Sequence, residues 1–134
     1  MPPHVLHFSR YWLPLVAYCA AIFLVSSVPG SGLRLLLFPH ADKVAHLLEY
    51  ALLGGLAIRA FGPGTRGFFT AAEALTASLL FAVLYGALDE VHQSYVPGRC
   101  MDFIDLALDV TGAALAAVVY ARWRGRSPRA TLPA

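Results

Sequence analysis

Charged residues are scarce in this chain of 134 residues. Lys, Arg, Asp and Glu make up 13% of it, whereas a soluble domain carries about 25%. The apolar residues reach 58%, which leaves too few polar groups to cover a surface in water. This composition excludes a soluble globular protein and a disordered one. A net charge of +2 also argues against a nucleic-acid partner.

Cysteine and the common catalytic motifs are equally sparse. Cys19 lies in an apolar run and Cys100 in a polar stretch, so the pair lacks the clustered spacing of a structural zinc site. No serine has the strand–turn–helix setting of a nucleophile elbow. The helical Glu-x-x-His and His-Glu-x-x-His patterns are absent as well. The sequence therefore assigns no metal and no cofactor, although carboxylates and histidines together could hold a divalent cation.

Long apolar runs are what the chain has instead. Each run has about 18 residues, which as a helix measures some 27 Å and is enough to cross a bilayer. The runs cover residues 11–28, 44–61, 71–88 and 103–121. We predict an all-α polytopic membrane protein, a bundle of four transmembrane helices that forms a single domain over residues 1–134.

The basic residues are unevenly distributed along these spans. In a four-span arrangement one side holds Arg10, Arg59, Arg66, Arg122, Arg124, Arg126 and Arg129, and the other holds Arg34, Lys43 and Arg99. The positive-inside rule places the richer side in the cytoplasm. We expect a multi-pass protein of the cytoplasmic membrane with both termini in the cytoplasm. All acids except Glu73 fall toward the opposite, outer side.

The outer acids follow helical spacing. Asp42, His46, Glu49 and Tyr50 share one face of the second predicted helix, and Asp102, Asp105 and Asp109 form a stripe on the fourth. Glu90 and Gln93 lie three apart at the end of the third helix, before a Pro-Gly turn that presents Arg99. Ionisable side chains at membrane depth are costly, so they face a bundle interior or a water-filled cavity and pair there. We expect these residues to converge with Lys43 and Arg99.

Three interpretations of this convergence remain open. The network can be structural, with Lys43 and Arg99 neutralising acids and joining helices. Residues near helix ends, namely Asp89, His92 and Asp102, can simply reach interfacial water. The functional interpretation is a polar pocket that opens to the outer leaflet and receives a lipid head group, a peptide-like ligand or a metal ion.

The same residues carry a resemblance to a known family. Asp42, Lys43 and His46 match a DK-x-x-H pattern, and an E-x-x-Q…P-x-R-x-x-x-x-x-D pattern is matched by Glu90, Gln93, Arg99 and Asp105. The chain thereby resembles the VanZ-like family of small bacterial membrane proteins over about residues 42–112. It departs at Asp109, where family members commonly carry Asn. The resemblance implies a four-helix bacterial membrane protein and an association with resistance to the glycopeptide teicoplanin.

Three functions compete on this basis. The first is an envelope protein that binds or shields a glycopeptide or a lipid-linked cell-wall precursor. The second is a membrane enzyme acting on a lipid phosphate or other envelope substrate, with His46 and Glu90 or Asp105 as acid and base. The third is a small transporter, for which a homo-oligomer could supply a path. The partners expected are membrane lipid and the envelope ligand, and no nucleic acid. The predicted polar site comprises Asp42, Lys43, His46, Glu49, Tyr50, Glu90, Gln93, Arg99, Asp105 and Asp109.

Overall fold

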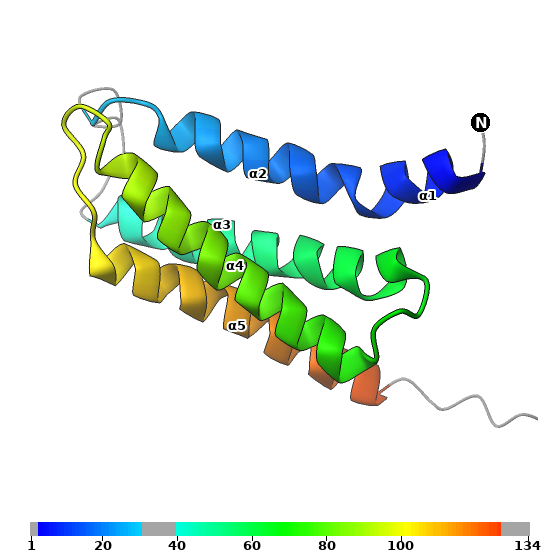
Figure 1. Cartoon of the computed structure of the whole chain (residues 1–134). Helices are drawn as coiled ribbons and strands as arrows, with labels where there is room; N and C mark the ends of the chain where they lie inside the picture. The colour runs from blue at the N-terminus through cyan, green and yellow to red at the C-terminus, as the bar shows by residue number, and fades with distance from the viewer. Residues whose placement is uncertain (1–2, 31–39, 127–134) are drawn as a thin grey trace, which may run out of the picture.

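The computed structural model describes residues 3–30 and 40–126, and within these ranges the regular structure is entirely helical. The elements in chain order are α1 (Pro3–Tyr11), α2 (Leu13–Ser26), α3 (Ala41–Phe61), the short 3-10 helix η1 (Pro63–Thr65), α4 (Ala71–Gln93) and α5 (Phe103–Arg126). Helices α3, α4 and α5 pack as a bundle, and α1 and α2 run along one side of it (Figure 1). The predicted all-α class is confirmed.

The described helices are suited to a bilayer. Helix α3 together with η1, helix α4 and helix α5 are each long and apolar enough to cross, and α1 and α2 reach that length only as a pair bent by 40°. Large apolar side chains are exposed on α2 to α5, for example Leu24, Leu48, Leu84 and Val119. In water such surfaces would promote aggregation, whereas in a membrane they face lipid. The chain is a polytopic membrane protein, and its described residues offer three spans, or four when the bent pair counts as one.

The first span differs from the single helix predicted over residues 11–28. Its helix begins earlier, at Pro3, and is interrupted at Trp12. Pro14 lies at the start of α2, where it has no backbone N–H to donate and disfavours a helical conformation in the residue before it. The bend therefore has a local cause in the sequence.

Helices α3 and α4 extend beyond the apolar runs at their polar ends. Helix α3 begins at Ala41 and α4 ends at Gln93, so the polar residues flanking both runs are helical. The start of α4 is fixed by a capping box, in which the Thr70 hydroxyl accepts from the Glu73 N–H and the Glu73 carboxylate accepts from the Thr70 N–H.

Glycine allows α3 and α5 to approach closely. A Cβ atom on Gly54 would lie 2.9 Å from Ala113 Cα, and one on Gly112 would lie 2.8 Å from Ala51 N and overlap the Leu47 carbonyl oxygen. Small residues at a helix crossing let the two backbones approach closely. Such packing matters in a membrane, because the surrounding lipid removes the hydrophobic driving force for helix association. This contact sets the distance between the polar faces of α3 and α5.

We expect Gly112→Ala to destabilise the bundle by about 2 kcal/mol or more, because the added methyl group overpacks a backbone contact. Gly55→Ala is the matched control, since a Cβ there would meet nothing within 4 Å. The measurement is the free energy of unfolding in mixed detergent micelles. Equal stability of the two variants would contradict the close α3–α5 approach.

Candidate functional site

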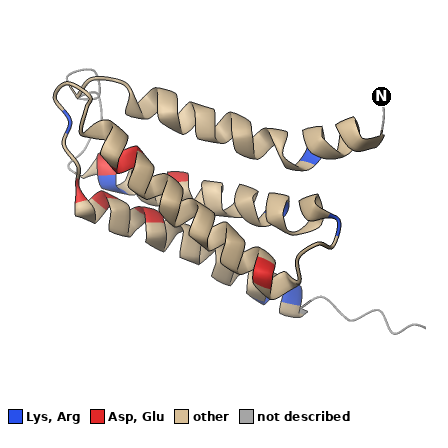
Figure 2. Ribbon diagram, in the orientation of Figure 1, with Lys and Arg blue, Asp and Glu red and all other residues tan. Residues whose placement is uncertain are grey.

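The acidic side chains gather at one end of the bundle, as predicted. Figure 2 shows them where α2 ends, α3 begins and α4 turns into α5, with Glu73 at the far end. Four of the acids in this cluster are buried, namely Asp89, Glu90, Asp105 and Asp109. Carboxylates withdrawn from water need hydrogen-bond donors or cations, so their partners determine the structure of this end.

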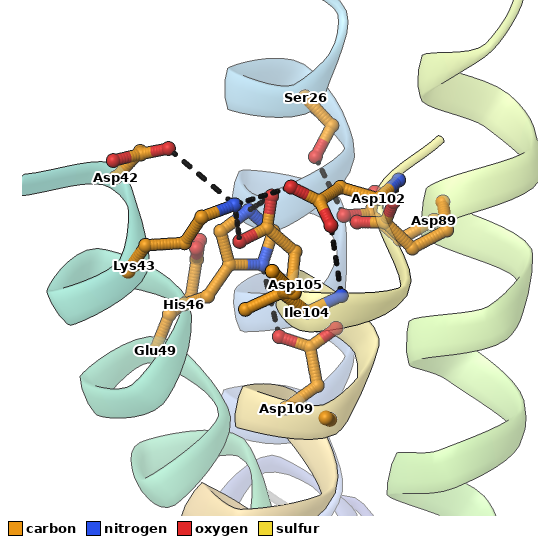
Figure 3. A network of polar contacts seen from close by, with 12 residues as sticks. Ser26, Asp42, Lys43, His46, Glu49, Asp89, Asp102, Ile104, Asp105 and Asp109 are labelled. Carbon is orange, nitrogen blue, oxygen red and sulfur yellow. Dashed lines mark hydrogen bonds and ion pairs between the residues drawn. The ribbon is translucent and has the colours of Figure 1, made fainter. Parts of the chain in front are cut away.

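Lys43 connects α3 to the start of α5. Its Nζ lies 2.5 Å from Asp102 Oδ2 and 2.7 Å from Asp105 Oδ1, and 3.7 Å from Asp42 Oδ2 (Figure 3). Asp102 also accepts the backbone N–H of Ile104 at 2.8 Å, which caps the first turn of α5. The hydrogen bond from Lys43 holds the pKa of the Asp102 carboxyl below its usual value. Three carboxylates thus share a single ammonium group.

His46 lies one turn further along α3, facing the same helix. Its Nδ1 is 2.9 Å from Asp109 Oδ1, and its Nε2 is 3.9 Å from Asp105 Oδ2. The Asp109 side chain is inaccessible to solvent, and that of His46 is 12% exposed. A carboxylate on each side fixes the orientation of the imidazole ring.

A second network joins α2 to α4. Asp89 Oδ2 accepts the Ser26 hydroxyl at 2.9 Å and the Gln93 amide at 2.9 Å. The expectation that Asp89 only reaches interfacial water is wrong, because the residue is 6% exposed and its Oδ2 accepts hydrogen bonds from two neutral donors. His92 was likewise expected to reach interfacial water, and its Nε2 lies 2.9 Å from the Ser27 hydroxyl oxygen.

Glu90 organises the turn between α4 and α5. It is fully buried, and its Oε2 accepts the backbone N–H of Asp102 at 2.7 Å. The turn also contacts the chain after α2, where Gly30 donates to the Pro97 carbonyl oxygen at 3.2 Å. A Cβ on Gly30 would overlap the Gly98 carbonyl oxygen, so this approach requires glycine.

A pocket of about 400 Å³ opens among these networks. Seven of the ten predicted residues line it, namely Asp42, Lys43, His46, Glu49, Gln93, Arg99 and Asp105, together with Ser26, Cys100 and Asp102 among others. The remaining three, Tyr50, Glu90 and Asp109, do not line it and are buried, each at most 1% exposed. The structure therefore brings the predicted residues together. Seven of them form part of the pocket wall, and the other three form a buried layer.

Arg99 lines the pocket from the α4–α5 turn and is not tied to a carboxylate. Its Nε donates to the Val28 carbonyl oxygen at 3.1 Å, and none of its nitrogens lies within ion-pair distance of an acid among the described residues. Lys43 differs from Arg99, because its ammonium group donates to the carboxylates of Asp102 and Asp105. Of the described basic residues that line the pocket, Arg99 is the cation that is free of carboxylates and available to an incoming group.

Sequence reasoning left Ser26, Asp89 and Asp102 out of the site. Ser26 lies on an apolar helix, where nothing in its neighbourhood marks it as a partner of Asp89. Asp102 had a usable signal, because it shares the three- and four-residue spacing of Asp105 and Asp109.

His46 of the pocket wall and two residues of the buried layer include groups that together could hold a metal ion. One ligand atom each from His46, Glu90 and Asp109 all lie within 4.8 Å of one another. The sequence did not indicate this set, because its members come from three helices and match no helical metal motif.

These features define a class: a small polytopic helical membrane protein with a pocket of ionisable residues at one end. The family model described as VanZ/LLP1 matches residues 6–124, and the chain belongs to that family. The resemblance inferred from the motifs is confirmed. No curated protein and no solved structure matches the chain.

We expect Lys43→Met to lower the unfolding midpoint in detergent, because it removes the ammonium group that bridges Asp42, Asp102 and Asp105. A carboxyl whose folded-state pKa is lowered stabilises the fold above its unfolded pKa of about 3.9 and loses that contribution as pH falls through the folded value. The difference between parent and variant should be full near pH 6 and should shrink below about pH 4. Lys43→Arg, which keeps the charge, should retain part of the parent stability. A difference that does not change with pH would argue against the bridge.

Proposed function

We propose that this protein is an envelope protein of the bacterial cytoplasmic membrane that binds or shields an envelope ligand without changing it chemically. The observation that carries the proposal is the pocket, which is lined by charged side chains from separate helices and lies at one end of the bundle. Binding sites are typically concave and combine apolar walls with a few convergent polar groups.

The chemistry of the wall favours a ligand with donors on one part and an anionic group on another. Carboxylates of Glu49, Asp42 and Asp105 can accept hydrogen bonds from hydroxyl or ammonium groups. Arg99 can grip a carboxylate or a phosphate with two parallel hydrogen bonds. A lipid-linked cell-wall precursor and a glycopeptide of the teicoplanin type both carry groups of these kinds.

The size of the pocket limits how much of the ligand enters. About 400 Å³ is near the lower end of the range of roughly 300–1,000 Å³ for small-molecule sites. A single sugar, peptide end or phosphate group fits, and a whole glycopeptide does not. Shielding such a group from an antibiotic, or holding the antibiotic by one group, would contribute to glycopeptide resistance.

The proposed orientation places the pocket outside the cell and both termini in the cytoplasm, on the positive-inside rule. Cys100 is exposed and lines the pocket, whereas Cys19 lies within α2. We expect a membrane-impermeant maleimide to label Cys100 in intact spheroplasts. The variant Cys100→Ser is the control and should remain unlabelled. Labelling of Cys100 only after the membrane is opened would reverse the orientation.

Arg99 provides the test of binding. We expect Arg99→Gln to weaken binding of the lipid-linked precursor or teicoplanin to the full chain in nanodiscs by about tenfold or more, because a charged hydrogen-bonding group is removed. Arg66→Gln is the matched control: it removes the same charge from an exposed position after η1, in the connection between the end of α3 and the start of α4 and outside the pocket. The measurement is a titration of each probe by microscale thermophoresis. Unchanged binding in both variants would count against the proposal, and so would a parent protein that binds neither probe.

An enzyme is the second candidate, and one contact favours it. The hydrogen bond between His46 Nδ1 and Asp109 Oδ1, in which the carboxylate accepts, orients the imidazole as a carboxylate orients a general base. Mass spectrometry of the lipid-linked probe after the binding titration separates the two candidates. A changed mass that depends on His46 would indicate catalysis, and an unchanged mass with retained affinity would indicate binding alone.

A further inference from the structure

We infer that His46, Glu90 and Asp109 form a site for one divalent transition-metal ion beneath the floor of the pocket. The three ligand atoms come from α3, α4 and α5 and lie within 4.8 Å of one another. Ligands of one Zn²⁺ ion lie about 2.0–2.2 Å from it, hence at most about 4.4 Å apart. Small side-chain rotations bring the present geometry into that range.

Unsatisfied oxygen atoms point independently to a missing cation. Glu90 Oε1 and Asp109 Oδ2 are buried without a hydrogen-bond partner among the described residues. Glu90 is 0% exposed and Asp109 is 1% exposed. A buried carboxylate oxygen without a donor is costly, and a metal ion bound by both would remove that cost at two atoms together.

One of the unsatisfied atoms, Asp109 Oδ2, lies against the backbone of α4. A Cβ on Gly86 would be 3.0 Å from Asp109 Oδ2 and 3.1 Å from Tyr50 Cε1, and Glu90 follows one helical turn later. The hydroxyl of Tyr50 is likewise buried without a partner in the described part of the chain. Asp109 Oδ2 is therefore aimed at α4 on the side where Glu90 lies.

Charge at this end favours a cation. Among the described residues, basic groups lie within 4.0 Å of the carboxylates of Asp42, Asp102, Asp105 and Asp109. The partner of Asp109 and of Asp105 Oδ2 is His46, which is charged only when it is protonated. Glu90 has no ion-pair partner there. A divalent ion would supply positive charge next to Glu90, which Lys43 and His46 do not pair with.

The ligand set selects the kind of ion. One imidazole nitrogen and two carboxylate oxygens suit Zn²⁺ or Mn²⁺, whereas Mg²⁺ and Ca²⁺ prefer oxygen ligands alone. When one ring nitrogen of His46 binds the ion, the other remains near an acid, Asp105 or Asp109, which would orient it. His46 also lines the pocket, so one of the three ligands is shared with the pocket wall.

The test is a metal titration of the full chain, purified in detergent and stripped with chelator. We expect ZnCl₂ or MnCl₂ alone to bind one ion per chain by calorimetry and to raise the unfolding midpoint. Glu90→Gln and Asp109→Asn should each weaken binding at least about 100-fold, since both remove a charged ligand. Asp89→Asn is the matched control, a buried carboxylate one residue from Glu90 that is already engaged by Ser26 and Gln93, and it should bind as the parent does.

Two outcomes would overturn the inference: a folded parent that binds neither ion below about 1 mM, or charge-neutral variants that bind as tightly as the parent. If a buried variant fails to fold, His46→Gln decides, because this side chain is partly exposed at the pocket wall. The site does not depend on the identity of the pocket ligand. A parent protein that binds the lipid probe but neither metal ion would reject the metal site and leave the proposed function standing.

Discussion

The ammonium group of Lys43 is the interaction on which the acidic end of this protein depends. It lies within 3.7 Å of three carboxylates, and it ties the first turn of α3 to the residues that begin α5. Without a cation there, the carboxylates of Asp102 and Asp105 would repel each other. The same bridge aligns α3 and α5 so that His46 meets Asp109 one turn deeper.

Close helix packing and polar networks support one another in this bundle. Gly54 and Gly112 let α3 and α5 approach until side chains as short as aspartate reach across the interface. Gly86 does the same for α4, whose backbone lies against Asp109 and Tyr50. Near the polar end, Ser26 brings α2 into contact with Asp89. The carboxylates are thus held by partners on neighbouring helices, which is the condition under which charges persist at membrane depth.

Much of the fold and of the site could be predicted from the sequence. Apolar runs of sufficient length predicted the membrane helices, and spacing of three and four residues placed His46 with Glu49 and Asp105 with Asp109. The bend at Trp12 was missed because the run was judged on hydropathy, although Pro14 was there to be used. The burial of Asp89 could not be predicted, since its donor Ser26 is 63 residues away on another helix.

The sequence by itself determined that this chain enters a membrane and that its acids share one end, because hydropathy and helical periodicity are local properties. Only the tertiary structure decided which acid meets which partner. Lys43 is 59 and 62 residues from the carboxylates it binds, and His46 is 63 from Asp109. Such pairs depend on the rotation and separation of packed helices, which are set by side-chain volumes across the whole interface. The division of one polar cluster into an open pocket and a buried group of metal-ligand type therefore appears only in three dimensions.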